Sequence, residues 1–153
     1  MSKLSNIILL LAITALASCT RVYEPGDYYK GDGFEGIVVT VDANSSPMLL
    51  LSFEEAHSLA ADSAEYWAEQ IGEGWRLPQK GELAQIYRVK TLINRTLEKK
   101  KKQLILNDFT YYWSSTPCSE THCYACGPDG VGCYYKENDG SSYRARAVRV
   151  ITE

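Results

Sequence analysis

The apolar positions in the first half of the chain predict a β-hairpin. Two runs rich in aliphatic and β-branched residues, 36–42 and 48–51, flank the turn-forming sequence Asn44-Ser45-Ser46-Pro47. Both runs are almost continuously apolar, whereas a strand with one face in water alternates between apolar and polar residues. We therefore expect two strands that are covered on both faces.

A spacing of three and four residues between apolar positions predicts a helix directly after this hairpin. Ser52 and Glu55 have the spacing of a capping box, in which each side chain accepts a hydrogen bond from a backbone amide at the helix start. We therefore expect the helix to begin at residue 53 and to end at Gly72-Glu73-Gly74. The apolar stripe consists of Phe53, Ala56, Ala60, Ala64, Trp67 and Ile71.

A second helix is expected after Pro78, because proline suits a first turn and Glu82 complements the helix dipole there. Its inward-facing residues should be Leu83, Ile86, Tyr87 and Ile93. The lysine run 99–102 lies where this helix should end, and its positive charge complements the terminal carbonyl groups. The alternative is a patch that binds anionic headgroups or sulfated glycan, and high salt should weaken such binding.

The last third of the chain returns to strand patterns. Aromatic and β-branched residues predict strands over 109–115, 133–136 and 143–151, with a turn at 137–140. Arg144 and Arg146 share one face of the final strand, so we expect that strand to pass from solvent into the core. We predict that these arginines and Arg149 make surface or structural ion pairs rather than a ligand site. Together the elements predict an α+β domain.

The first 19 residues resemble the leader of a bacterial lipoprotein. Lys3 precedes an uncharged run over 5–17, and Leu16-Ala17-Ser18-Cys19 has the pattern at which such precursors are cut and acylated. The apolar stretch is too short for a membrane-spanning helix, which takes about 20 residues. We expect removal of residues 1–18 and lipidation of Cys19, with two or three acyl chains as the membrane anchor. The alternative is a plain secretory signal with an ordinary Cys19.

Removal of this leader leaves residues 19–153, which is the size of one domain. We predict a lipidated tether over 19–33 and a folded domain over 34–153. The remaining charges are 15 Lys and Arg against 19 Asp and Glu, a net charge of −4. That balance predicts no nucleic-acid partner. Thr20 replaces the Asp that often retains lipoproteins at the inner membrane, which favours the outer membrane, on its periplasmic or surface side.

Export changes how the four remaining cysteines are interpreted, because thiols in an oxidising compartment tend to pair. They lie within 16 residues and permit three pairings that the sequence does not separate, so we expect two disulfides of unassigned connectivity. These cysteines are Cys118, Cys123, Cys126 and Cys133. The alternative is a zinc site that uses these sulfurs and His122, although the spacing does not provide two separate chelating pairs.

Three short segments together resemble the domain of unknown function 1566, also called the Lcl C-terminal family. They are Gly74-Trp75-Arg76-Leu77-Pro78 with Glu82-Leu83, Tyr112-Trp113-Ser114-Ser115-Thr116, and Arg146-Ala147-Val148-Arg149, in this order over residues ~34–151. The resemblance implies a C-type-lectin-like fold with two helices and small antiparallel sheets, related to formylglycine-generating enzymes. Many members are exported or lipid-anchored, and some are adhesins for sulfated glycans.

The chain departs from these relatives in ways that bear on function. Gln79 stands where members often have Thr or Ser, so we expect a less well capped second helix. The Glu-Pro-Asn and Trp-Asn-Asp motifs of calcium-dependent lectins are missing, so no calcium or other cofactor is predicted. Cys118 and Cys123 have the spacing of the two copper-binding cysteines in formylglycine-generating enzymes, which leaves a copper oxidase as a remote alternative.

The sequence therefore predicts a non-enzymatic, lipid-anchored envelope protein that binds a glycan or an envelope protein noncovalently. No group of residues forms a recognisable catalytic set. The expected ligand contacts are aromatic, because such side chains give large, rigid area with a polar group. They are Trp113, Tyr124, Tyr134 and Tyr135. The second interpretation is a structural envelope component that has no small ligand.

Overall fold

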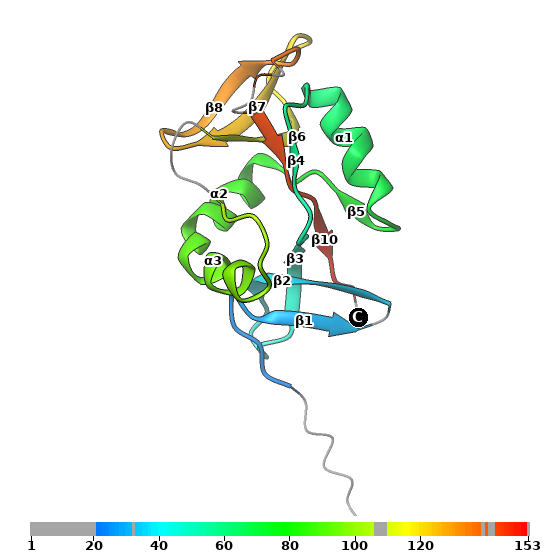
Figure 1. The fold of residues 1–153 in the computed structure, drawn as a ribbon, viewed down its shortest axis with the longest axis vertical. Helices are drawn as coiled ribbons and strands as arrows, with labels where there is room; N and C mark the ends of the chain where they lie inside the picture. The colour runs from blue at the N-terminus through cyan, green and yellow to red at the C-terminus, as the bar shows by residue number, and fades with distance from the viewer. Residues whose placement is uncertain (1–20, 32, 106–109, 139, 141–142, 153) are drawn as a thin grey trace, which may run out of the picture.

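The computed structural model describes residues 21–31, 33–105, 110–138, 140 and 143–152. Within them the chain forms three helices and two five-stranded sheets, which follow one another along the long axis of the molecule (Figure 1). The helices are α1 (Ala61–Gln70), α2 (Lys80–Arg88) and α3 (Lys90–Lys99). The strands are β1 (Tyr28–Gly31), β2 (Phe34–Val41), β3 (Pro47–Leu51), β4 (Ala56–His57), β5 (Trp75–Arg76), β6 (Tyr111–Pro117), β7 (His122–Gly127), β8 (Gly130–Tyr135), β9 (Tyr143–Ala145) and β10 (Val148–Val150).

The two sheets are connected directly by the last strands of the chain. The first sheet has the order β1-β2-β3-β10-β5 and the second β4-β9-β6-β7-β8. All described neighbours are antiparallel except β6 and β9, which are parallel. The predicted strand over 143–151 is thus two strands, because Arg146 and Ala147 leave the second sheet and the chain enters the first. The predicted start at Phe109 lies outside the described residues.

Part of the predicted tether belongs to the folded domain, which corrects the expectation of a tether over 19–33. Strand β1 pairs with β2, with Tyr28 opposite Ile37. Tyr23 is buried, and its amide donates to the carbonyl of Ser45 at 2.9 Å. Aromatic side chains at positions 23, 28 and 29 give this segment enough apolar surface to pack. Residues 1–20, including the predicted leader and Cys19, lie outside the described residues.

The hairpin predicted over residues 36–51 is confirmed as β2 and β3. Leu51 lies opposite Ile37, and Leu50 opposite Val38. Both strands are covered on both faces, as their continuous apolar character predicted. Val38 and Leu50 belong to one buried cluster, while Ile37 and Leu51 belong to the other.

The first helix begins at Ala61 rather than at residue 53, so the predicted capping box is wrong. The hydroxyl of Ser52 donates to the carbonyl of Glu54 at 2.8 Å, and the side chain of Glu55 is buried against Arg146 instead of reaching a helix amide. Residues 56 and 57 add as the short strand β4 to β9. The amide of Ala61 is satisfied by the carbonyl of Lys136 at 2.9 Å, so no side-chain cap is needed there.

The predicted second helix is confirmed in position, but it is divided into α2 and α3 at Val89. The backbone of Val89 leaves helical geometry (φ −102°, ψ 12°). The division redirects the chain, and the apolar residues of both helices reach the same buried cluster. Leu83, Ile86 and Ile93 are buried in it as predicted, and Tyr87 packs against it.

The fold is therefore mixed α+β, with three helices and two mostly antiparallel sheets. Its core has two clusters, and each takes side chains from both sheets. None of the helices in the described part of the chain combines the length and apolar character needed to cross a bilayer.

Candidate functional site

The segment that carries the candidate ligand contacts is a rigid hairpin of β7 and β8. Within it, Gly127 and Gly130 close a tight turn around Pro128 and Asp129. Gly130 has a φ of +103°, a backbone conformation that residues with a side chain rarely adopt. The strands pair continuously from His122 opposite Tyr135 to Gly127 opposite Gly130.

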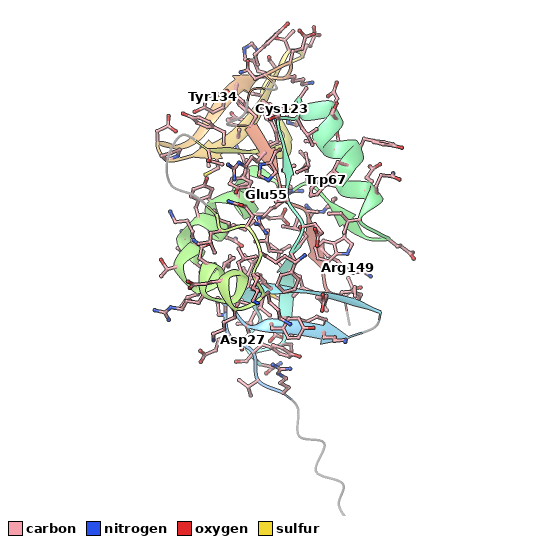
Figure 2. The ribbon with its side chains drawn as sticks, in the orientation of Figure 1. Asp27, Glu55, Trp67, Cys123, Tyr134 and Arg149 are labelled. Carbon is pink, nitrogen blue, oxygen red and sulfur yellow. A yellow bond between two sulfur atoms is a disulfide. The ribbon has the colours of Figure 1, made fainter. Side chains whose placement is uncertain are left out.

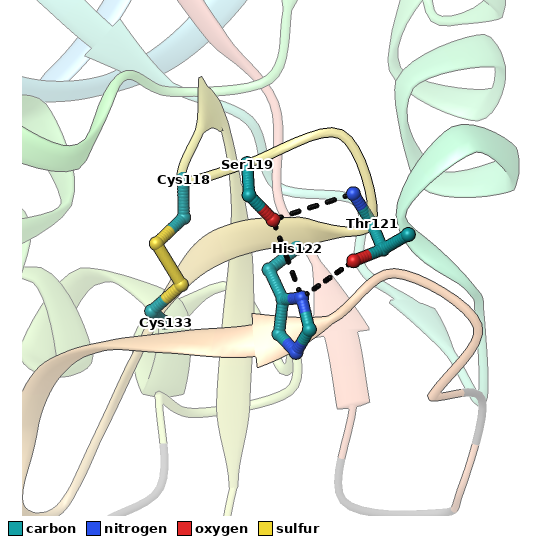
Figure 3. The surroundings of a disulfide bond; sticks show 5 residues. All are labelled: Cys118, Ser119, Thr121, His122 and Cys133. Atoms are coloured by element: carbon teal, nitrogen blue, oxygen red, sulfur yellow. Dashed lines mark hydrogen bonds between the residues drawn. A yellow bond between two sulfur atoms is a disulfide. The ribbon is translucent and has the colours of Figure 1, made fainter.

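One disulfide joins this hairpin to the end of β6. Cys118 is bonded to Cys133, with 6.0 Å between their Cα atoms (Figure 3). The predicted disulfide is thus confirmed for this pair. It fixes β8 to the turn that precedes β7, where the amides of Cys118 and Ser119 both donate to the carbonyl of His122.

The second predicted disulfide does not form, and Cys123 and Cys126 are free and buried. The two residues lie three positions apart on one strand, so their side chains point to opposite faces of the sheet. Cys123 belongs to the cluster around Trp113, and Cys126 to the cluster around Tyr112. Burial raises the pKa of Cys123 and raises that of Cys126 to about 11, so both thiols are protonated at neutral pH and react slowly.

The same pairing bears on the metal alternatives. Because Cys118 is in the disulfide, Cys118 and Cys123 are not a pair of free thiolates. The Nδ1 atom of His122 lies 2.9 Å from the hydroxyl of Thr121 and 3.3 Å from that of Ser119 (Figure 3). Among the described residues, no three or more His, Cys, Asp and Glu side chains gather as metal ligands.

The four aromatic residues predicted as ligand contacts do not lie together. Trp113 is fully buried, and its indole N–H donates to the carbonyl of Leu59 at 2.7 Å, so this residue was wrongly predicted as a contact. Tyr134 lies opposite Cys123 and packs on Tyr111, with 4.9 Å between ring centroids. It therefore occupies the face of the hairpin that contributes to the core cluster around Trp113.

Tyr124 and Tyr135 lie together on the face of the hairpin opposite to that of Tyr134. Residues directly opposite each other in a ladder point to the same side, and Tyr124 is opposite Cys133 while His122 is opposite Tyr135. Tyr135 is 43% exposed, and its ring meets that of His122 edge to face at 5.5 Å. We call this surface the hairpin face; it consists of His122, Tyr124, Val131, Tyr135 and the Cys118–Cys133 disulfide.

A hollow of about 500 Å³ lies beside the hairpin face, where α2 begins. It is lined by Gln79, Lys80, Gly81, Ser115, Thr116 and Pro117. The ammonium of Lys80 lies 4.5 Å from the centroid of the Tyr124 ring, which links the hollow to the hairpin face. A bound group in the hollow would therefore meet a cation and an aromatic face together.

The first backbone amides of α2 have hydrogen-bond partners, although Gln79 in place of Thr or Ser predicted a less well capped helix. The amide of Lys80 donates to the hydroxyl of Thr116 at 3.0 Å, and the amide of Gln79 donates to the Glu82 carboxylate at 2.7 Å. Arg76 adds two hydrogen bonds of 2.8 Å to that carboxylate. Burial alone would raise the pKa of Glu82, but these bonds outweigh it and hold the pKa below its ordinary value. The rim of the hollow is thus fixed by a charged pair.

A second hollow of similar volume lies at the turn between β1 and β2. It is lined by Lys30, Gly31, Gly33, Phe34 and Glu35. Phe34 is its aromatic residue, and the guanidinium of Arg149 already covers that ring at 3.8 Å. The hollow beside Lys80 is the stronger candidate because it adjoins the hairpin face, on which Tyr135 is exposed.

The sequence did not indicate the charged cluster at the centre of the molecule. The side chain of Glu55 is only 2% exposed and lies between the two sheets (Figure 2). It accepts hydrogen bonds from Arg144 at 2.8 Å, Arg146 at 2.9 Å and the Tyr112 hydroxyl at 2.7 Å. Arg146 also donates to the carbonyls of Ser52, Phe53 and Gln103. The predicted structural ion pairs are confirmed for these two arginines, and the cluster is too buried to meet a ligand.

Two members of the lysine run 99–102 make intramolecular contacts. The ammonium of Lys100 lies 3.6 Å from the centroid of the Tyr28 ring, and that of Lys102 lies 2.6 Å from the Glu54 carboxylate. These contacts join the end of α3 to β1 and to the segment after β3. They agree with the structural interpretation of the run.

Comparison with known proteins adds no relationship to these observations. No protein-family model matches this sequence, and no curated protein matches it. Function is therefore argued from the geometry of the hairpin face and of the hollow beside Lys80.

Proposed function

We propose that this protein is a lipid-anchored module of the bacterial cell envelope that binds a glycan or a protein noncovalently through the hairpin face. The observation that carries this proposal is the grouping of Tyr124, Tyr135 and His122 on one side of a cross-linked hairpin, next to the hollow that contains Lys80. Exposed aromatic side chains that are held rigidly lose little entropy on binding.

The arrangement of the molecule suits display of this surface. The first described residues leave one end of the long axis, and the β7–β8 hairpin forms the opposite end (Figure 1). If Cys19 carries the lipid, the anchor lies two residues, at most about 7 Å, from Arg21. Packing of Tyr23 and β1 leaves little free tether, so the hairpin would point away from the bilayer.

The chemistry of the site suits a sugar ring with an anionic substituent. A sugar can lie against the ring of Tyr124 while a sulfate or carboxylate group reaches the ammonium of Lys80, 4.5 Å from that ring. The resemblance to the Lcl C-terminal family agrees with such a ligand. A protein ligand would use the same aromatic surface as its central contact.

Replacement of both Tyr124 and Tyr135 by alanine should weaken ligand binding by at least about tenfold, because central aromatic contacts carry much of the affinity of a binding surface. The test is binding of the full chain, purified in detergent, to an array that includes sulfated and non-sulfated glycans. The matched control is Tyr66→Ala on α1, which removes a tyrosine that is 66% exposed and is not part of the hairpin face.

Retained binding in the double variant, or equal loss with Tyr66→Ala, would contradict the assignment of the hairpin face. A blank array together with stable co-purification of an envelope complex that survives loss of both tyrosines would favour the structural-component interpretation instead. Full binding in 0.5 M salt would remove Lys80 from the proposed contact, because electrostatic attraction weakens with salt.

A further inference from the structure

The outer edge of β8 presents backbone hydrogen-bonding groups, chiefly those of Val131 and Cys133, that pair with no described strand. The amide of Lys136 donates to the carbonyl of Thr121, so residues 136, 134, 132 and 130 direct their backbone groups toward β7. Because these directions alternate along a strand, Val131, Cys133 and Tyr135 direct theirs away from the sheet. Of these groups, the carbonyl of Tyr135 accepts a hydrogen bond from the amide of Asn138 at 3.1 Å. Strand β8 is the last in its sheet, and no described strand covers these groups.

This edge lacks the features that normally prevent strands from pairing with other chains. Proteins protect such edges with charges, prolines or very short strands. The other outer strands of the two sheets have such protection: β4 and β5 have two residues each, and β1 carries the exposed Lys30. Strand β8 has six residues, Gly-Val-Gly-Cys-Tyr-Tyr, without charge or proline.

The pattern of β8 is complementary to itself. An antiparallel pair centred on Cys133 would place Val131 opposite Tyr135 of the second copy, and both side chains are exposed, by 40% and 43%. The amide and carbonyl of Cys133 would then meet those of their counterpart, and the amide of Tyr135 would meet the carbonyl of Val131 in the second copy. Asp129 would lie near Lys136 and Glu137 of the second copy, whose charges offset each other.

On the opposite side of the strand, Gly132 would lie opposite Tyr134 of the second copy. A Cβ atom at Gly132 would come within 2.7 Å of its own Tyr134 ring, so that ring already fills the space beside the glycine. Gly132 therefore adds no side chain of its own to this side of the pair.

We propose that the outer edge of β8 binds the same edge of a second copy of this protein, which joins two five-stranded sheets into one of ten strands. The disulfide and the β7 ladder hold β8 extended before pairing, so little conformational entropy is lost. The pair brings two hairpin faces side by side. A polymeric ligand could then bind both, with a gain in avidity and no new contact.

The experiment is site-specific photo-crosslinking in cells that produce the full chain. A photoreactive phenylalanine analogue at position 131 should give a covalent product of twice the protein's mass, whereas the same analogue at position 66 on α1 should not. Analytical ultracentrifugation of the detergent-purified full chain should show a dimer whose population rises with protein concentration.

Three substitutions at one position separate backbone pairing from side-chain contact. Val131→Pro removes an amide that points away from β7, and Val131→Lys adds a charge, so both should abolish the dimer while thermal melting of the protein stays unchanged. Val131→Thr keeps the amide and should keep the dimer. If Val131→Pro lowers the melting temperature of the protein, Val131→Lys becomes the variant that tests the dimer.

Three results would overturn the proposal. These are a monomer at every concentration, a crosslink at position 131 only to a different protein, and a dimer that persists in Val131→Lys. The dimer test needs no ligand, so its outcome is independent of whether the hairpin face binds a glycan.

Discussion

Replacement of Glu55 by alanine should lower the free energy of unfolding by about 3–5 kcal/mol, the cost of leaving a buried charge without its partner. Arg146 is only 2% exposed, and its guanidinium would lose the carboxylate that it contacts at 2.9 Å. Arg144 would lose its bond to the same group. Urea denaturation followed by circular dichroism measures the change, as a lower midpoint.

The control for this prediction is the neighbouring residue. Glu54→Ala removes an exposed ion pair with Lys102, and such pairs contribute about 1 kcal/mol or less. Adding Arg146→Met to Glu55→Ala should recover part of the loss, because it removes the unpaired charge. A loss below about 1 kcal/mol for Glu55→Ala would show that the cluster does not hold the two sheets together.

Loss of the Cys118–Cys133 disulfide should lower the free energy of unfolding by roughly 3 kcal/mol, the chain-entropy value for a loop of about 15 residues. The two cysteines are 15 positions apart. The double variant Cys118→Ser, Cys133→Ser provides the measurement by urea denaturation.

Reduction supplies the matched test of that prediction. Dithiothreitol should destabilise the wild-type protein by the same amount and leave the double serine variant unchanged, because Cys123 and Cys126 are already thiols. Equal sensitivity of both proteins to dithiothreitol would contradict the observed pairing.

Local sequence patterns predicted the elements whose structure is decided locally. The β2–β3 hairpin follows from two apolar runs around a turn, and the start of α2 follows from Pro78 and Glu82. Long-range partners decided the rest. Ser52 and Glu55 have the spacing of a capping box, yet Glu55 pairs with arginines that lie 89 and 91 positions further along the chain.

The candidate site was predicted only in part, because long-range partners also decide its arrangement. The sequence indicated the aromatic residues and the cysteine pairing in general, but not which faces of the hairpin they occupy. The ladder register separates Tyr124 and Tyr135 from Tyr134, and it places Cys123 and Cys126 on opposite sides. Trp113 differs from the exposed tyrosines only through the packing of β6 between β9 and β7, which no local pattern reveals.

The residues that carry the family resemblance have structural roles in this fold. Trp75 and Leu77 are buried, Arg76 pairs with Glu82, and Arg146 pairs with Glu55. They therefore support the arrangement of the core rather than the identity of a ligand. The proposed ligand surface lies instead on the cysteine-containing hairpin.

Mass spectrometry of the mature protein, isolated from the envelope without reduction, tests the central claim most directly. We predict a chain that begins at an acylated Cys19, a peptide pair linked through Cys118 and Cys133, and two thiols, at Cys123 and Cys126, that are alkylated only after unfolding. An unlipidated chain that begins at Met1 and contains reduced Cys118 and Cys133 would contradict both the anchoring and the rigid hairpin on which the proposed binding surface depends.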